Sequence, residues 1–425
     1  MIFQKLQKAI LVGANFNNQP NFEDQMEELS HLAEACDIEA VGQITQNLNR
    51  ENIAYYIGKG KVQEVLELIN EKGADTVIFN DELSASQIRN LEAALECRII
   101  DRTVLILDIF ASRAKTREAK LQVEIAKLQY MLPRLVGLRD SLSRQGGGSG
   151  FSNKGLGETK LELDHRKIGG RINRLQKELE ELVAHRQNQR KKRKKEEIPT
   201  VALVGYTNAG KSTVMNAMID LYHPSSDKQV LEKNMLFATL ETSVRSIKLP
   251  DNKLFLLTDT VGFINKLPHQ LVKAFRSTLE EVAEADILIH VVDYSNPNYE
   301  EQVEVTKETL KELGADNIPV IYAYNKIDLV GGYIPYGSKD FVYISARKKF
   351  GIDKLTAAIR QKAFTQYVQC KMLLPYDKGD VLYYLKGNAT INSTVYTDDG
   401  MLMSVECKEA DQKKYKQYIT HTNLQ

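Results

Sequence analysis

The stretch that decides the fold is Val201-Ala-Leu-Val-Gly205-Tyr-Thr-Asn-Ala-Gly210-Lys211-Ser212. Its apolar start predicts a strand, and the run Ser212–Met218 predicts a helix. Between them the residues fit the pattern G-x-x-x-x-G-K-[ST], in the strand–helix context that this pattern needs. Glycines let backbone N–H groups approach a phosphate, and a helix amino terminus adds positive potential. The stretch therefore predicts a phosphate-binding loop. The alternative is a glycine-rich turn without a ligand.

The phosphate half of the site continues at the next apolar strand, KLFLLTDT. We expect Lys211 to contact the β- and γ-phosphates and Ser212 to ligate Mg²⁺. The Asp259 carboxylate ends the strand and is placed to hold the Mg²⁺ water shell, while Gly262 can approach the γ-phosphate. Catalytic roles are predicted for Lys211, Asn208 and Gly262. The residues expected to contact nucleotide or metal here are Gly205, Tyr206, Thr207, Asn208, Ala209, Gly210, Lys211, Ser212, Thr213, Asp259, Thr260, Val261 and Gly262.

A second motif, Asn325-Lys-Ile-Asp328, follows the strand PVIYAYN. A carboxylate accepts two hydrogen bonds from the N1–H and N2–H₂ edge of guanine. Adenine has no matching donor pair, so it would leave Asp328 unsatisfied. Motifs at the carboxyl ends of successive strands are what a nucleotide site in an α/β sheet needs. The residues expected at the base are Asn325, Lys326, Ile327, Asp328, Ser345, Ala346 and Arg347. Asp286 and Asp293 are interpreted as strand-end residues without chemistry.

A segment that reads the γ-phosphate is expected between Lys211 and Asp259. The best candidate is Phe237-Ala-Thr239-Leu-Glu, in which Thr239 could place its hydroxyl and carbonyl on Mg²⁺ and phosphate. Thr242, or a plain loop, is the alternative. The segment comprises Phe237, Ala238, Thr239, Leu240 and Glu241, and the predicted metal ligands are Ser212, Thr239 and Asp259.

Two side chains bear on the chemistry. Phe263 follows DTVG, where many GTPases carry a glutamine that positions water. Because phenylalanine cannot orient water by hydrogen bonding, slow intrinsic hydrolysis is predicted, with the water positioned by another group. Asn208 could help to bind a monovalent cation near the phosphates. This hypothesis predicts faster hydrolysis in K⁺ than in Na⁺, and equal rates in matched KCl and NaCl would contradict it.

The remaining sequence predicts a multidomain α/β protein. Residues 1–110 alternate apolar runs with helical periodicity, which predicts an N-terminal α/β domain. Residues 111–198 carry two apolar seams at helical spacing around a glycine-rich stretch, which predicts an antiparallel helical hairpin with a non-helical tip. Residues 199–362 form the P-loop domain. Residues 363–425 predict a small α+β domain whose hairpin turns at Asp398–Gly400.

Composition excludes several classes of protein. Hydrophobic residues make 43% and charged residues 27% of the 425 residues, so the chain is not wholly disordered. No apolar run reaches the roughly 18 residues of a membrane helix. The first residues predict a strand and not an export signal. Four cysteines without a CxxC pair indicate free thiols in a reducing cytosol, without zinc. The net charge of +1 confines nucleic-acid affinity to local patches.

With these motifs, the chain resembles the HflX-type GTPases, a ribosome-associated family. The resemblance includes Tyr56-Ile-Gly58-Lys-Gly60-Lys61, Asp101-Arg102-Thr103, Leu121-Gln-Val-Glu124, and the runs GYTNAGKST, LFATLE, DTVGFI, VVDYSNP and NKID. It implies Mg²⁺-dependent GTP hydrolysis, binding to the large ribosomal subunit and its rRNA, and GTP-dependent splitting of stalled or idle ribosomes in the cytoplasm. A monomer is the default expectation.

The hairpin tip departs from the family pattern. Lys154 stands where arginine is usual, Leu156 replaces proline and Lys160 replaces glutamine. This departure motivates a second hypothesis, a GTP-gated regulator or assembly factor that binds the subunit without splitting. The basic run Arg190–Lys195 fits a solvated helix end or a phosphate contact with RNA. Gly58–Lys61 fits a turn that starts a helix or a phosphate cradle.

Overall fold

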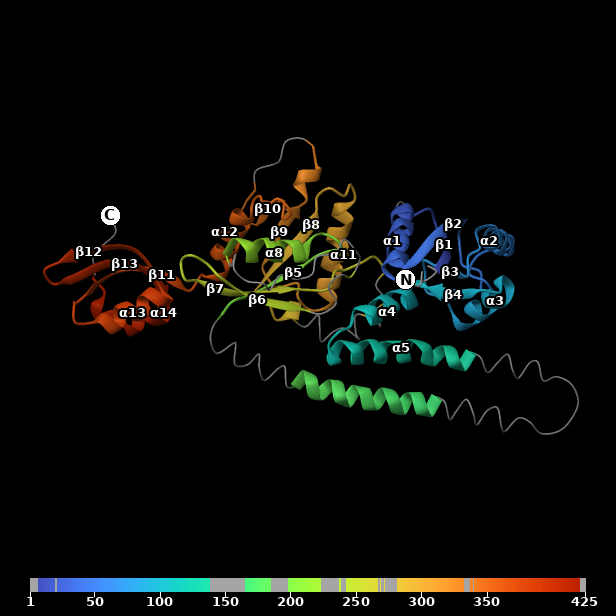
Figure 1. Cartoon of the computed structure of the whole chain (residues 1–425), viewed down its shortest axis with the longest axis horizontal. Helices are drawn as coiled ribbons and strands as arrows, with labels where there is room; N and C mark the ends of the chain where they lie inside the picture. Colours follow the sequence, from blue (N-terminus) through green and yellow to red (C-terminus); the bar gives the residue numbers. More distant parts are fainter. Residues whose placement is uncertain are drawn as a thin grey trace, which may run out of the picture. The chain divides into compact units, whose positions relative to one another are not determined.

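The computed structural model describes residues 7–19, 21–137, 165–184, 198–222, 237, 242–266, 268, 271, 281–331, 337–338 and 340–420. Figure 1 shows the chain coloured along its sequence. The chain divides into two compact units. The first comprises Met1–Lys191, Lys233–Glu241 and Val261–Thr278, and the second comprises Lys192–Glu232, Thr242–Thr260 and Leu279–Gln425.

The N-terminal domain is a parallel sheet with helices in the crossovers. Its elements are β1 (Gln7–Phe16), α1 (Phe22–Ala35), β2 (Ile38–Leu48), α2 (Lys59–Lys72), β3 (Thr76–Phe79), α3 (Ala85–Leu95), β4 (Arg98–Asp101) and α4 (Arg102–Arg113). The strand order is β2-β1-β3-β4, all parallel. Gly58 is the N-cap of α2, which confirms the turn that starts a helix. The Asp101 carboxylate caps α4 by accepting from the Val104 N–H at 2.9 Å, so α4 starts directly at the sheet edge.

The predicted antiparallel hairpin is present. Its first helix is α5 (Arg117–Gly137), and residues 165–184 form the second. Arg117 pairs with Glu178 at 2.7 Å, and Arg171 pairs with Glu124. Because an early residue of α5 meets a late residue of the second helix, and a later one meets an earlier one, the two helices run antiparallel side by side (Figure 1). The tip, with Lys154, Leu156 and Lys160, and the run Arg190–Lys195 lie outside the described residues.

The central domain carries the phosphate-binding loop. Its elements are β5 (Thr200–Val204), α8 (Lys211–Tyr222), β6 (Ser243–Lys248), β7 (Leu254–Asp259), β8 (Ile287–Asp293), α11 (Tyr299–Glu312), β9 (Val320–Asn325), η1 (Ile327–Leu329), β10 (Phe341–Tyr343) and α12 (Ile352–Ala363). The sheet order is β10-β9-β8-β5-β7-β6. Only β6 is antiparallel to its neighbour, and the sequence analysis did not predict it. Its side chains are mostly half-buried or exposed, so it lacks the apolar run of the other strands.

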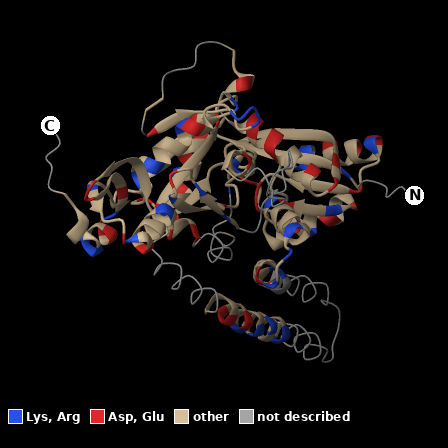
Figure 2. Ribbon diagram, turned by 60° about the vertical axis from the view of Figure 1, so that its left-hand side comes forward, with Lys and Arg blue, Asp and Glu red and all other residues tan. Residues whose placement is uncertain are grey.

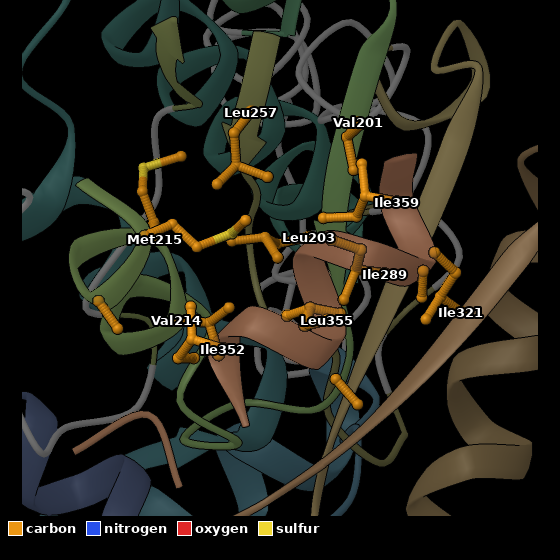
Figure 3. Packing of buried hydrophobic residues seen from close by; sticks show 14 of the residues in the cluster. Val201, Leu203, Val214, Met215, Leu257, Ile289, Ile321, Ile352, Leu355 and Ile359 are labelled. Atoms are coloured by element: carbon orange, nitrogen blue, oxygen red, sulfur yellow. The ribbon is translucent and has the colours of Figure 1, made fainter. Parts of the chain in front are cut away.

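The core of this domain lies between one face of the sheet and two helices. Side chains of β5, β7, β8 and β9 on one face pack against α8 and α12, as Figure 3 shows for Val201, Leu203, Leu257, Ile289 and Ile321 with Val214, Met215, Leu355 and Ile359. Burial of this apolar surface holds the carboxyl ends of the parallel strands at one edge of the sheet.

The C-terminal domain is the small α+β unit that the sequence predicted. It comprises β11 (Tyr367–Leu374), α13 (Gly379–Asn388), β12 (Thr390–Thr397), β13 (Gly400–Lys408), α14 (Glu409–Lys414) and η2 (Lys416–Tyr418). The three strands form an antiparallel sheet in the order β11-β13-β12, with the β12–β13 turn at Asp398–Asp399. The buried Lys253 after β6 donates to Glu406 of β13 at 2.7 Å, which anchors this domain to the central one.

The predicted fold class is confirmed, while the limits 1–110, 111–198, 199–362 and 363–425 remain a proposal. Within the part of the chain that the structure describes, no helix combines the length and the apolar character needed to cross a membrane.

His290 in the middle of β8 makes the stability of the fold sensitive to acid. The side chain is 2% exposed, and burial, reinforced by Lys211 and Lys307, lowers its pKa to about 3. An unfolded histidine has a pKa of about 6.5, so the unfolded chain binds a proton that the folded chain excludes. The contribution of the neutral His290 side chain to the free energy of unfolding is complete above about pH 6.5. It is lost as the pH falls towards about 3.

We therefore expect the free energy of unfolding to decrease by up to about 1.4 kcal/mol per pH unit across this window through His290 alone. His290→Phe should remove that part of the slope. Urea unfolding of both proteins between about pH 4 and about pH 7 measures it. Identical slopes in the two proteins would contradict the assignment.

Candidate nucleotide-binding site

The phosphate-binding loop after β5 requires its two glycines. Gly205 has a φ of +141° and Gly210 a φ of +97°. A Cβ on Gly205 would lie 2.2 Å from the Val291 carbonyl oxygen, and one on Gly210 would lie 2.3 Å from Asn325 Nδ2. A side chain at Gly205 would have to move the backbone of β8, and one at Gly210 would have to displace the Asn325 side chain. The loop is therefore packed directly on the neighbouring strands.

Lys211 opens α8 as a buried cation. It is 7% exposed, and its Nζ donates to the carbonyl oxygens of Gly205 at 3.0 Å and Tyr206 at 2.8 Å. Burial lowers the pKa of Lys211 to about 8, against the opposing effect of Asp259. A buried ammonium in a glycine loop favours an anionic ligand, because such a ligand offsets the cost of removing the charge from water.

Two predicted Mg²⁺ ligands lie together, Ser212 in the first turn of α8 and Asp259 at the end of β7. Ser212 Oγ donates to Asp259 Oδ2 at 2.6 Å, and Asp259 is completely buried. A hydroxyl and a carboxylate are the hard oxygen ligands that Mg²⁺ prefers when it also binds phosphates. Thr207 in the loop has a buried hydroxyl that finds no hydrogen-bond partner among the residues that the structure describes, and a phosphate oxygen can satisfy such a group. These side chains fit a Mg²⁺–nucleotide complex.

The base half of the site is joined to the phosphate loop by Asn325. Its Nδ2 donates to the Ala209 carbonyl oxygen at 2.9 Å, and its Oδ1 accepts from the Ala346 N–H at 3.0 Å. Ser345 Oγ donates to Asp328 Oδ1 at 2.7 Å. This hydrogen bond is the main cause of a lowered pKa of Asp328. The carboxylate therefore stays charged and acts only as an acceptor, as guanine recognition needs.

The structure does not test several of the predicted site residues. Thr239, with Ala238, Leu240 and Glu241, lies outside the described residues. Phe237, Val261 and Gly262 are buried in the first unit, so their contact with nucleotide stays a prediction. Arg347 is exposed beside Ala346. Phe263 is 1% exposed, which agrees with an apolar packing role in place of water positioning.

The structure gives Asp293 a contact that the sequence did not predict. Asp293 ends β8, as expected of a strand-end residue, and its Oδ2 accepts from Lys326 Nζ at 2.6 Å. The signal that could have found it is the pairing of strand ends, because Asp293 is opposite Asn325 in the β8–β9 register. Asp286, at the other end of β8, accepts only a strand-end bond from the Thr200 N–H at 2.7 Å among its described contacts.

Comparisons with known proteins agree with this geometry. The family described as GTP-binding GTPase N-terminal matches residues 23–111, GTP-binding GTPase Middle Region matches residues 113–193, and 50S ribosome-binding GTPase matches residues 200–326. The chain is 46% identical to GTPase HflX of Caldanaerobacter subterraneus subsp. tengcongensis, over 97% of this chain and 94% of that protein. The chain belongs to the HflX GTPase family.

Two other known proteins are similar to this chain. GTPase HflX of Escherichia coli is 40% identical over 88% of this chain and 87% of its own length. Among solved structures, a GTP-binding protein from Sulfolobus solfataricus in complex with GDP is 26% identical, with a TM-score of 0.44 over 84% of this chain and 98% of that one. Membership in the HflX family, together with the GTPase domain, establishes that this chain binds guanine nucleotides and hydrolyses GTP.

Proposed function

We propose that this HflX-family GTPase binds the large ribosomal subunit and its rRNA in the GTP state and splits stalled or idle ribosomes. The proposal places it in the cytoplasm, as a monomer when free. The observation that carries the proposal is that segments expected to respond to the γ-phosphate contact the N-terminal domain.

In the proposed site, each side chain has one task. Lys211 contacts the β- and γ-phosphates, and Asp328 selects guanine. Ser212 and Asp259, with Thr239 as a predicted partner, would hold Mg²⁺, which supplies positive charge against the phosphate oxygens when bound. Asn208 would assist a K⁺ ion.

Arg102 at the start of α4 connects the N-terminal sheet to the segment after β7. The side chain is 2% exposed. Its Nη1 donates to Asn80 Oδ1 at 2.9 Å, and its Nη2 donates to the Asn265 carbonyl oxygen at 3.0 Å. Glu28 lies 3.0 Å from the same Nη2 and balances the charge. A guanidinium that is bound on several sides has little conformational freedom. A displacement of Asn265 would therefore move Arg102 and, through it, Asn80 at the end of the N-terminal sheet.

Two further contacts support this coupling. Lys266 Nζ donates to Asp81 Oδ1 at 2.5 Å, just beyond the end of β3. The Phe237 ring, from the predicted γ-phosphate segment, meets the Phe110 ring of α4 edge to face, with centroids 4.7 Å apart. Both segments therefore have partners in the N-terminal domain, and a change from GTP to GDP would be transmitted to it.

The ribosomal partner is supported by the family description of residues 200–326, which reads 50S ribosome-binding GTPase. Figure 2 shows that Lys and Arg are interspersed with Asp and Glu over most of the ribbon. In the second hairpin helix, the Lys and Arg residues lie within positions 165–177. The Glu residues follow them, within positions 178–181. RNA contact is thus expected from local basic groups and not from the net charge.

Light scattering of intact ribosomes tests the proposal. Wild-type protein with GTP, or with a non-hydrolysable analogue, should reduce the scattering because the subunits separate. No reduction at saturating protein would exclude splitting. In that case, sedimentation with separated large subunits under GTP and GDP decides whether the protein is a GTP-gated regulator or assembly factor, which the departures at Lys154, Leu156 and Lys160 favour.

A further inference from the structure

Asp293 and Lys326 form an ion pair at the edge of the sheet that carries the nucleotide motifs. Asp293 is the last residue of β8, and Lys326 directly follows β9. The two strands are parallel neighbours with Asp293 opposite Asn325. Asp293 Oδ2 accepts from Lys326 Nζ at 2.6 Å, and the two side chains are 16% and 24% exposed. The ion pair is thus partly shielded from solvent and sits beside the guanine motif.

Further contacts and the local backbone hold both partners of the ion pair. The second carboxylate oxygen of Asp293 accepts from Ser295 Oγ at 2.6 Å and from the Ser295 N–H at 3.1 Å. The Tyr294 N–H donates to the Asn325 carbonyl oxygen at 3.0 Å, which continues the ladder past the strand ends. Lys326 has a φ of +64°, a left-handed conformation that a lysine adopts only when its surroundings impose it.

The residues on either side of Lys326 are fixed to different parts of the site. Asn325 is bound to the phosphate loop and to Ala346, and Asp328 is bound to Ser345. Lys326 therefore belongs to a turn whose neighbouring residues are fixed, two positions before Asp328, the carboxylate proposed to recognise guanine. An unrestrained lysine would lose rotamer freedom when a base packs against it, whereas a lysine already held by a carboxylate would not.

We propose that Asp293 is a positioning residue for guanine nucleotides, which holds Lys326 so that its aliphatic stem is a preformed wall of the base site. The proposal rests on the proposed role of Asp328 at the base. It assigns Asp293 to the base half of the site, separate from the phosphate half at Lys211 and Ser212. Loss of Asp293 should therefore weaken GDP and GTP equally, mainly through faster dissociation.

The test is a double-mutant cycle of Asp293→Asn and Lys326→Met. Asparagine keeps an oxygen for the Ser295 bonds but loses the charge that holds Lys326. Methionine keeps an unbranched stem without the ammonium. Each single variant should bind GDP on the order of tenfold more weakly, and the double variant should bind it no more weakly than Lys326→Met alone. In Asp293→Asn the KM for GTP should rise more than kcat falls, because the base half of the site does not touch the reacting phosphate.

Asp286→Asn is the matched control, since it changes the carboxylate at the opposite end of β8, which accepts from the Thr200 N–H. It should leave GDP affinity unchanged. Unchanged GDP affinity in Asp293→Asn, or additive losses in the double variant, would overturn the inference. If Asp293→Asn does not fold, Lys326→Met alone decides, and wild-type affinity in that variant would overturn it. A wild-type protein that binds no GDP would instead overturn the nucleotide site itself.

Discussion

Lys211→Ala is expected to abolish binding of GTP and GDP under ordinary assay conditions. The side chain is a buried cation at the start of α8. Charge-assisted hydrogen bonds to phosphate contribute about 1.5–3 kcal/mol each. Two such bonds correspond to a loss of roughly 10²–10⁴-fold in affinity. Titration calorimetry with GDP measures it directly.

The same substitution should not destabilise the nucleotide-free protein. Burial lowers the pKa of Lys211, which means that the charged side chain is costly to bury in the absence of an anion. The control is Lys349→Ala, because Lys349 is a lysine of the same domain that is 56% exposed and pairs with Asp220 at 2.8 Å. The control should bind GDP normally. Lys211→Ala with an affinity within about tenfold of the wild type would contradict its role.

Asp328→Asn is expected to exchange guanine for xanthine as the preferred base. The carboxylate offers two acceptors to the N1–H and N2–H₂ donors of guanine, whereas the asparagine amide places a donor against one of them. An unsatisfied polar group costs about 1–3 kcal/mol, so GDP affinity should fall by roughly 10–100-fold. Xanthine has a carbonyl at the 2-position, which accepts from the new amide.

Displacement of a fluorescent guanine nucleotide by GDP and by xanthosine diphosphate measures both affinities. Asp353→Asn, at the first turn of α12 and exposed, is the control for loss of a carboxylate from the same domain. Tight GTP binding by Asp328→Asn would refute the role assigned to this carboxylate. The hydrogen bond from Ser345 should persist in the variant because asparagine retains the accepting oxygen.

The local parts of the molecule could be predicted because their signals lie within a few residues. The P-loop is one strand, one turn and one helix, and the turn at Asp398–Gly400 is equally local. β6 was missed because an antiparallel edge strand with half-exposed side chains has no clear periodicity. The place of β6 in the sheet is set by its pairing with β7. Because pairing depends on two segments, the pattern of one segment does not predict it.

The amino-acid sequence by itself determined the fold class, the guanine-nucleotide motifs and the resemblance to HflX-type GTPases, since each depends on residue types at fixed short spacing. Only the tertiary structure decided which distant residues meet. Asp293 reaches Lys326 because β8 and β9 are in register. Arg102 reaches the carbonyl oxygen of Asn265, 163 positions later, because both are packed into one unit. Such contacts arise from burial of the apolar faces of strands and helices, which brings polar side chains together without a pattern in the sequence between them.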